Sequence, residues 1–509
     1  MKPGAIAIAV MAATLALVTA VSAAPIHVDG GLVAGTVKDG TRTWLGIPYA
    51  APPVGDLRWR APQAVVPWTG VRQATSFSKA CRQTATWITF PESEDCLYLN
   101  VWAPAAPKGQ KNLKKLPVMV WIHGGGYYGG TAQQPLYDGV HMARHGVIVV
   151  TLNYRLGVFG FFSHPELAAE GKVDGNQGVL DQVAALQWVR SNIAAFGGDP
   201  HRVTIFGESA GSASVAVLET SPLAKGLFQR AIAESGTTAI DPRETGRLDK
   251  SAAEANGVAL GQALNAPHLA DLRKLDTETV IAQPWGPHLV VDNYLIPTDM
   301  TTAYKAGAPS RVPLLLGWNA DEGKDLAGEA LAHEALTVAR YPELAARLIG
   351  HTPSQALLDA YPVKSDVDVK PMLFKVMNDA WSWHMFTWAK LHRAAGSGPV
   401  YVYDFVHIPA EPKTPCGYGC GAGHGAEIPY VYDQLAQDSR TWSADDYRVA
   451  ERMVTYWTNF AKTGNPNGKG LPQWQAFDGN DASVIRLGSD AEVKAAPPLP
   501  DYQLIGGQP

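Results

Sequence analysis

The stretch GGDPHRVTIFGESAGS, residues 197–212, decides the fold of this chain. Residues 202–206 (RVTIF) are a short apolar run that predicts a buried strand, and GESAGSASVAVL behind it predicts a turn that continues as a helix. The turn has the pattern G-x-S-x-G, in which Gly207 and Gly211 allow a sharp change of direction and raise the Ser209 hydroxyl above the sheet. Ser209 is therefore the candidate nucleophile, and the alternative is a chance match in a chain with 50 glycines.

Strands and helices alternate on both sides of this stretch. Apolar runs at 116–122, 146–152, 312–316 and 400–405 predict further strands, and residues 178–196 carry apolar side chains at helical spacing. Such alternation predicts the α/β class, with a mainly parallel sheet covered by helices on both faces. The functional site of such a sheet lies at the carboxyl ends of its strands.

A serine hydroxyl attacks poorly unless a base takes its proton and an acid orients that base. The candidate base is His424, in GCGAGHGAEI (419–428). Cys416, Cys420 and His424 stand four residues apart, which on a helix would align three metal ligands. The alternating glycines instead predict a loop, which favours a catalytic imidazole over a metal site. We interpret the glycines as leaving room beside His424 for the serine, a carboxylate and the substrate.

The candidate acids follow the strand predicted at 312–316. Asp321 and Glu322 both lie there, and either one could instead cap a helix. The chain order serine, acid, histidine is the order expected for a hydrolase whose serine lies between a strand and a helix.

The HGGG sequence at 123–126 follows another predicted strand. Such a loop supplies backbone N–H groups for the negative charge that develops on a carbonyl oxygen, and Ala210 supplies one more from the head of the helix. The alternative is a plain glycine turn.

Composition and the N-terminus bear on the compartment. The 509 residues are 46% apolar and 17% charged with a net charge of −5, so nothing predicts binding to nucleic acid or to an anionic membrane surface. Lys2, an apolar run at 5–21 and an A-x-A-like site ending at Ala23 predict a signal peptide over 1–23, with an uncleaved anchor as the alternative. Length alone suggests about three domains. A site assembled from residues 123 to 424 instead predicts one domain over 24–509.

The four cysteines, Cys81, Cys96, Cys416 and Cys420, fit an oxidising compartment. They allow three pairings, and proximity in the sequence favours Cys81 with Cys96 and Cys416 with Cys420. The second pair would stiffen the glycine-rich loop of His424. No Asn-x-Ser/Thr sequence occurs, so we expect no N-glycosylation.

Six stretches in order resemble the type-B carboxylesterases, the group that includes cholinesterases and bacterial para-nitrobenzyl esterases. They are EDCLYLNVWAP (94–104), WIHGGGYYGG (121–130), NYRLGVFGFF (153–162), GGDPHRVTIFGESAGS (197–212), NADEG (319–323) and GHGAEIPY (423–430). The resemblance runs from about Gly31 to Trp474. It implies an α/β-hydrolase fold, whose central, mostly parallel sheet is flanked by helices.

The resemblance also implies a Ser-Glu-His triad of Ser209, Glu322 and His424, which favours Glu322 over Asp321. The implied oxyanion donors are Gly125, Gly126 and Ala210, with Gly124 beside them.

Further roles follow from the same resemblance. Ser235 matches a serine that supports the acid and the histidine, and we expect Glu208, next to the nucleophile, to lie behind the triad as well. Cys81 with Cys96 matches the first disulfide of the family. Arg58 with Glu94 matches a structural ion pair.

The substrate pocket is assigned less directly. Tyr127 is expected to line it, and so are Trp383 and His384 in the aromatic segment 378–391, which in relatives lines the pocket. The alternative for this segment is ordinary core packing by its aromatic side chains.

The sequence therefore predicts an exported serine esterase that hydrolyses small-molecule carboxylic esters through an acyl-enzyme. We expect no cofactor, no metal, no nucleic acid and no stable membrane association. A lipase, lactonase or amidase with the same triad is the nearest alternative. A non-catalytic binding protein of this fold would typically have lost the serine.

Overall fold

A computed structural model of the chain describes residues 21–38, 40–105, 115–171, 173–238, 248–307, 309–412, 421–437, 439–479, 484–490 and 492–493. Most of the predicted signal peptide lies outside these residues, and so do Cys416 and Cys420.

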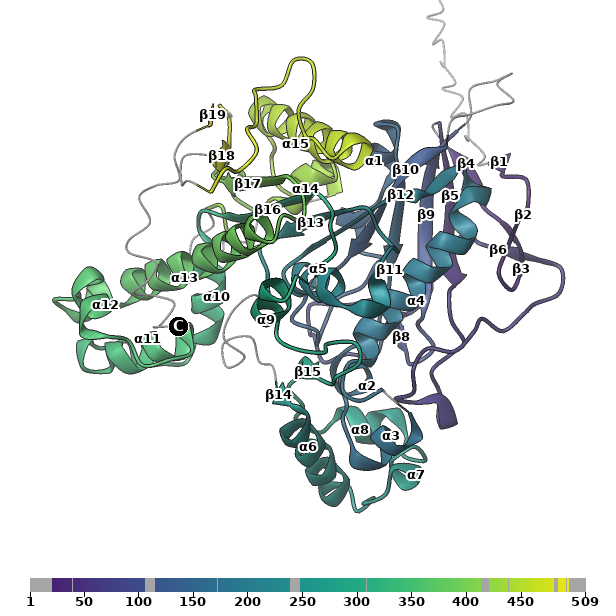
Figure 1. Cartoon of the computed structure of the whole chain (residues 1–509), viewed down its shortest axis with the longest axis horizontal. Coiled ribbons are helices and arrows are strands. Elements are labelled where there is room, and N and C mark those ends of the chain that lie inside the picture. The colour runs from purple at the N-terminus through teal and green to yellow at the C-terminus, as the bar shows by residue number, and fades with distance from the viewer. Residues whose placement is uncertain are drawn as a thin grey trace, which may run out of the picture.

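A twelve-stranded sheet forms the centre of the molecule (Figure 1). In spatial order its strands are β1 (Val21–Ser22), β4 (Thr36–Lys38), β5 (Thr41–Pro48), β9 (Tyr98–Pro104), β11 (Ile148–Leu152), β10 (Leu116–Ile122), β12 (Gly198–Glu208), β13 (Arg230–Glu234), β16 (Leu314–Asn319), β17 (Val400–Phe405), β18 (Val484–Leu487) and β19 (Glu492–Val493). The seven strands from β11 to β18 pair in parallel, as predicted. The outer strands pair antiparallel, which the sequence did not predict.

Both faces of this sheet are buried. Successive side chains of a strand point to opposite faces, so one strand contributes to two hydrophobic cores. In β10, Val118, Val120 and Ile122 belong to one hydrophobic core, whereas Met119 and Trp121 belong to the other. This explains why the strand reads as a continuous apolar run rather than as an alternation.

Helices cover each face. The first core includes side chains of α4 (Gln177–Asn192), α5 (Ala210–Thr220) and α13 (Asp366–Ala394). The second includes those of α1 (Val140–Arg144), α14 (Ile428–Val431) and α15 (Ala444–Thr463), the last of which lies near the top of Figure 1. The helix predicted over 178–196 forms as α4 followed by a 3₁₀ turn at Ile193–Phe196. No helix among the described residues is long and apolar enough to span a bilayer.

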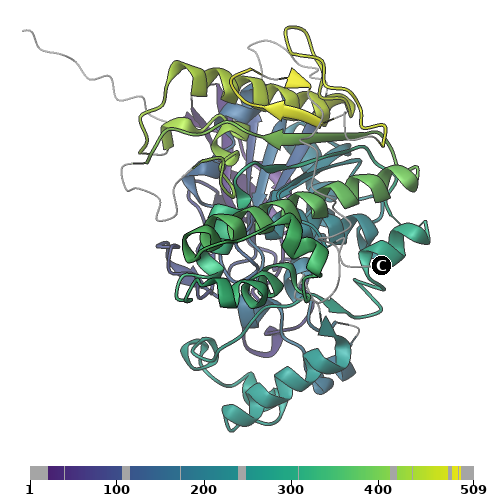
Figure 2. The ribbon, with the colours of Figure 1, turned by 90° about the vertical axis from the view of Figure 1, so that its left-hand side faces the viewer.

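The remaining elements extend the two ends of the molecule. A third, smaller core lies among helices at the bottom of Figure 1, namely α2 (Gly157–Gly160), α3 (Pro165–Glu170), α6 (Lys250–Ala263), α7 (Leu269–Leu272) and α8 (Thr277–Ile281). Figure 2 is viewed from the side of α10 (Glu322–Ala330), α11 (Tyr341–Ile349), α12 (Gln355–Ala360) and α13. Helix α9 (Met300–Lys305) packs near α5 and α13. The minor strands are β2 (Ile26–Val28), β3 (Gly31–Ala34), β6 (Val71–Gln73), β7 (Ala80–Cys81), β8 (Glu92–Ser93), β14 (Leu248–Asp249) and β15 (Val290–Val291).

The topology brings distant parts of the sequence to one edge of the sheet. Ser209 follows β12, Glu322 begins the helix after β16, and His424 lies in the loop after β17. These strands are parallel and lie within one run of neighbours, so their carboxyl ends meet.

Candidate active site

Ser209 occupies the turn between β12 and α5. Its φ is 55° and its ψ is −122°, a left-handed backbone that costs a non-glycine residue about 1–3 kcal/mol. Two hydrogen bonds hold the turn. The Ser209 N–H donates to the Glu234 carbonyl at 2.9 Å, and the Ala213 N–H donates to the Ser209 carbonyl at 2.9 Å.

The two glycines of G-x-S-x-G act through close packing. Neither has a positive φ, so the strained backbone falls on the serine alone. A Cβ at Gly207 or at Gly211 would come within 3.0 Å of the Ile122 carbonyl oxygen at the end of β10. The elbow therefore needs glycine because the helix head packs directly on the neighbouring strand.

The structure brings Ser209, His424 and Glu322 together. His424 Nε2 lies 2.9 Å from Ser209 Oγ, and His424 Nδ1 lies 2.7 Å from Glu322 Oε2. Glu322 is fully buried, and its other oxygen accepts the Asn319 N–H at 2.9 Å. In the neutral imidazole, Nδ1 carries the proton because an ionised carboxylate can only accept, which leaves Nε2 to accept from the serine.

Acidic residues around α10 hold the His424 loop. Asp325 Oδ2 accepts the His424 backbone N–H at 2.9 Å, and Asp321 Oδ2 accepts the Ala422 N–H at 2.9 Å. A Cβ at Gly421 or Gly423 would come within 3.0 Å of these carboxylates. These two glycines thus let the carboxylates of Asp321, just before α10, and Asp325, within it, reach the loop backbone. The sequence interpretation, centred on the imidazole, had missed this role. Asp321 has this supporting contact and does not bond the imidazole.

A second carboxylate faces the imidazole. Glu208 Oε1 lies 3.3 Å from His424 Nε2, and its side chain is almost fully buried. Burial raises the pKa of Glu208 to about 7, although the imidazole opposes the shift. Burial likewise raises the pKa of Glu427 to about 8, with Glu208 adding to it.

The histidine responds in the opposite sense. Burial alone lowers the pKa of His424, but the negative charges of Glu208 and Glu322 outweigh burial and raise it above its ordinary value of 6.5. Because these groups interact strongly, they titrate as a set rather than one at a time.

The loop after β10 contains the expected oxyanion donors. Gly125 and Gly126 have φ of 104° and 57°, and a Cβ at Gly124 would come within 3.0 Å of Glu208 Oε2. Among the described residues, no protein acceptor binds the N–H groups of Gly125, Gly126 or Ala210. Gly126 and Ala210 line the same cavity as Ser209, where such donors would face a substrate carbonyl.

This cavity has a volume of about 270 Å³ and extends from Ser209. Its lining residues are Gly126, Tyr127, Ser209, Ala210, Ala213, Gly236, Thr237, Thr238, Pro287, Leu289, Leu348, Met377, Ala380, Trp381, His384 and Met385. Tyr127 and His384 thus lie where the sequence predicted. The Tyr127 hydroxyl and Ser214 Oγ lie 3.2 Å apart, which fixes the ring in the wall.

Trp383, also expected at the pocket, is not among the residues that line this cavity, and helix geometry explains why. The lining residues of α13 are Met377, Ala380, Trp381, His384 and Met385. Their spacing of three and four residues places them on one face. Trp383 lies about 200° around the helix from Trp381 and packs against the first core, with Lys390 Nζ 5.9 Å from its ring centroid. Helical spacing from His384 would have selected Trp381 instead.

Comparison with known proteins identifies the family. The profile of the carboxylesterase family matches residues 22–504. The chain belongs to the carboxylesterase family.

Relatives agree with this assignment. The chain is 37% identical to the fumonisin B1 esterase of Sphingopyxis macrogoltabida over 490 residues, which covers 91% of this chain and 86% of that protein. It is also 37% identical to the para-nitrobenzyl esterase of Bacillus subtilis (strain 168) over 492 residues, which covers 92% and 95%. A solved PNB esterase structure superposes with a TM-score of 0.81 at 32% identity and covers 94% of this chain and 99% of that one. The protein is therefore a carboxylic ester hydrolase with the α/β-hydrolase fold.

Two predicted features of the carboxylesterase scaffold are present. Cys81 and Cys96 form a disulfide. Arg58 and Glu94 form a two-pronged ion pair with distances of 2.7 and 2.6 Å.

The remaining predictions about supporting groups stay open. Cys416 and Cys420 lie outside the described residues, so their pairing stays a prediction. The Ser235 hydroxyl has no hydrogen-bond partner among the described residues, so its support of the triad also stays a prediction.

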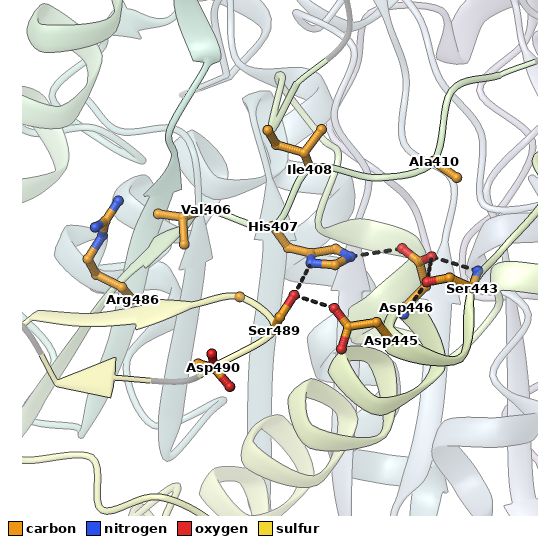
Figure 3. A pocket seen from close by; sticks show the side chains of 11 residues that line it. Val406, His407, Ile408, Ala410, Ser443, Asp445, Asp446, Arg486, Ser489 and Asp490 are labelled. Atoms are coloured by element: carbon orange, nitrogen blue, oxygen red, sulfur yellow. Dashed lines mark hydrogen bonds and ion pairs between the residues drawn. The ribbon is translucent and has the colours of Figure 1, made fainter.

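A larger cavity of about 670 Å³ lies elsewhere and contains a second serine, histidine and aspartate (Figure 3). His407 Nε2 is 2.8 Å from Asp446 Oδ1, but His407 Nδ1 is 3.5 Å from Ser489 Oγ, too long for a good hydrogen bond. The Ser489 hydroxyl donates to Asp445 instead. Ser489 is not among the described residues with a positive φ, so its backbone lacks the strain of Ser209. Ser209 is therefore a better candidate than Ser489 for the nucleophile of ester hydrolysis.

Proposed function

We propose that this carboxylesterase hydrolyses neutral, largely apolar esters through an acyl-enzyme on Ser209. The observation that carries the proposal is the position of His424, within hydrogen-bond distance of both Ser209 Oγ and Glu322 Oε2. A nucleophile, a base and an acid that orients the base are the parts that acyl transfer needs.

The first half-reaction forms the acyl-enzyme. His424 Nε2 takes the Ser209 proton as Oγ bonds to the substrate carbonyl carbon, and the carbonyl oxygen becomes negative. The N–H groups of Gly125, Gly126 and Ala210 receive that charge. The bond from carbon to the alcohol oxygen then breaks, and His424 returns its proton to the departing alcohol.

The second half-reaction uses water in place of the serine. His424 takes a proton from water while the water oxygen bonds to the acyl carbon. The bond from that carbon to Ser209 Oγ then breaks, and the serine regains a proton from the imidazole. The carboxylic acid leaves, and the enzyme returns to its starting state.

The 270 Å³ cavity fits the acyl group. Because His424 must protonate the alcohol oxygen, the alcohol lies on the imidazole side of Ser209. The cavity opens from Ser209 and the expected oxyanion donors Gly126 and Ala210, and its lining does not include His424, so we place the acyl group there and the alcohol beside the imidazole. Among the described residues no Lys, Arg, Asp or Glu lines it, which favours an uncharged acyl chain. A cavity of about 150 Å³ already holds benzene, so medium-length or aromatic acyl groups fit.

Steady-state hydrolysis of para-nitrobenzyl esters tests the triad, since a similar enzyme is named for such esters. We expect Ser209→Ala and His424→Ala to lower kcat by about 10⁴-fold or more. Ser489→Ala is the matched control from the other serine–histidine–aspartate set and should keep kcat within about twofold. If Ser489→Ala loses activity while Ser209→Ala keeps it, the proposal is wrong.

We also propose that residues 1–23 direct export and are removed. The segment has the pattern of a signal peptide, and the Cys81–Cys96 disulfide is typical of proteins outside the cytosol. The family match begins at residue 22, two residues before the proposed new N-terminus, and cleavage after Ala23 would remove only the two-residue edge strand β1. N-terminal sequencing of the protein recovered from the periplasm or the medium should begin at Ala24. Recovery of an uncleaved chain from the cytosol contradicts this.

A further inference from the structure

Trp381 touches the catalytic histidine from the side. It lies on the 29-residue helix α13, and its ring stands nearly perpendicular to that of His424, with 5.8 Å between centroids and 86° between planes. The loop of His424 and helix α13 are otherwise separate elements, so this contact joins the base to a long, regular helix.

The indole is itself held in place. Its Nε1–H donates to the Ser235 carbonyl at 3.0 Å, and the Ser235 N–H in turn donates to the Gly317 carbonyl of β16 at 2.9 Å. Ser235 immediately follows β13, which neighbours the strand that carries the nucleophile. Trp381 thus has one end fixed to the sheet and presents its ring to the imidazole.

We propose that Trp381 is a positioning residue that holds the His424 imidazole in the plane required for proton transfer. This rests on the proposed role of His424 as the base. The hydrogen bonds of His424 to Ser209 and Glu322 both involve ring nitrogens, so they leave the ring free to tilt about the line through those atoms. A third contact, away from that line, restricts the tilt.

Small errors in the orientation of the imidazole are costly. A general base works only within about 2.6–3.2 Å of the proton it takes, and a misplaced ring loses rate steeply. The stabilisation free energy of a perpendicular aromatic pair at this separation corresponds to a change of about two- to twelvefold in a rate constant. We therefore expect a loss of that size when the ring is removed.

Trp381 has a second role in the cavity wall, and the two roles predict different kinetics. A wall residue changes KM and does so more for long acyl groups than for acetyl. A positioning residue changes kcat by the same factor for every acyl group, because the imidazole takes part in each reaction.

The experiment compares two substitutions at each of two tryptophans of α13. Trp381→Phe keeps a ring but loses the N–H donor, and Trp381→Leu loses both. Trp383→Phe and Trp383→Leu are the matched controls, since Trp383 is on the same helix but outside the cavity lining. Rates are measured with para-nitrobenzyl acetate and hexanoate, together with the rate at which a small methylphosphonate labels Ser209.

We expect Trp381→Leu to lower kcat about two- to twelvefold relative to Trp383→Leu, equally for both esters, with the acetate KM unchanged. Labelling should slow by the same factor, and Trp381→Phe should lie between Trp381→Leu and the wild type. If only the hexanoate KM changes, or if labelling keeps its rate, Trp381 is a wall residue and the proposal fails. If Trp381→Leu does not fold, Trp381→Phe alone decides by the same criteria. Retention of activity in His424→Ala would instead remove the proposed function itself.

Discussion

At the scale of single residues, negative charge around His424 sets the pH at which the imidazole accepts a proton. The ordinary pKa of histidine predicts a transition near 6.5 from sequence alone. Glu208 and Glu322 raise the pKa of His424 above that value, so the active, neutral form appears only at higher pH. We therefore expect kcat/KM to rise with pH through a midpoint above 6.5.

Replacing Glu208 tests this electrostatic account. Glu208→Gln keeps the size of the side chain and removes its charge, so the pKa of His424 should fall and the midpoint of the pH profile should move down by about one pH unit. Glu451→Gln, an exposed position on α15, is the control and should leave the profile in place. A midpoint that stays fixed or moves up in Glu208→Gln is inconsistent with Glu208 acting on the imidazole.

Asp325 provides a second test, directed at the loop backbone. It accepts the His424 N–H, and a lost hydrogen bond of this kind is worth about 1 kcal/mol, or roughly fivefold. Asp325→Ala should lower kcat about fivefold, whereas Asp325→Asn keeps an acceptor and should lose less. Equal kcat in both variants and in the wild type would show that the loop is held by other contacts.

Sequence reasoning reached the chemistry-bearing residues of the candidate site but not those that hold them. Ser209 and His424 could be selected because their chemistry demands particular residue types in a particular chain order, whereas that order left Asp321 and Glu322 open and only the family resemblance favoured Glu322. Asp325 and Trp381 act through a backbone contact and a ring contact, and these depend on how α10 and α13 pack. Helical spacing from His384 could have indicated that Trp381 shares its face, but neither spacing nor residue type predicts the contact with His424 or the hydrogen bond of Asp325.

At the scale of elements, α13 supplies one wall of the cavity that we propose for the acyl group. Met377, Trp381 and Met385 face it from successive turns, and methionine is flexible enough to adapt to different acyl chains. The same helical face explains why Trp381 lines the cavity while Trp383, only two residues away, does not.

A bulkier side chain on this face should shift the preference of the enzyme to shorter acyl chains. Met377→Trp fills space in the cavity, and losing room for two methylenes costs about 1.6 kcal/mol, or roughly fifteenfold in kcat/KM. We expect kcat/KM for octanoyl esters to fall by this factor relative to kcat/KM for acetyl esters. Met372→Trp, also on α13 but outside the lining, should leave the ratio unchanged. An unchanged ratio in Met377→Trp would mean that the acyl chain lies elsewhere.

The strands show which parts of the fold a sequence predicts well. Residues 116–122 and 400–405 form strands over the predicted ranges because they are buried on both faces and read as unbroken apolar runs. β12 is longer than predicted at both ends: it begins at Gly198, where residues 199–201 are less buried than the apolar run and break the pattern, and it continues to Glu208. The antiparallel outer strands have short or mixed patterns, and their pairing depends on contacts distant in the chain.

At the scale of the whole molecule, the buried pair Arg58–Glu94 ties the N-terminal segment to the small lower core. Arg58 donates both to Glu94 and to the Leu275 carbonyl at 2.7 Å. This pair links the segment before β9 to the lower helices, and the single domain over residues 24–509 stays a prediction.

Breaking this ion pair should lower the stability of the fold and leave kcat unchanged. Glu94→Gln leaves a buried guanidinium without its counter-charge, which costs about 3–5 kcal/mol. With an unfolding entropy of roughly 2.1 cal/mol/K per residue, Tm should fall by about 3–5 °C while kcat at lower temperature stays unchanged. Glu278→Gln breaks the exposed pair with Arg82 and should shift Tm by less than about 1 °C. A fall in kcat without a fall in Tm would contradict a scaffold role for Glu94.

Covalent labelling of the nucleophile tests the central claim most directly. The purified enzyme is treated with a methylphosphonate ester, digested and analysed by peptide mass spectrometry. The strained elbow and the hydrogen bond from Ser209 to His424 predict one adduct, on Ser209, with loss of activity in proportion to labelling. His424→Ala should slow the labelling, and Ser209→Ala should abolish it. An adduct on Ser489 or any other residue, or full activity in the Ser209-labelled enzyme, would contradict the account.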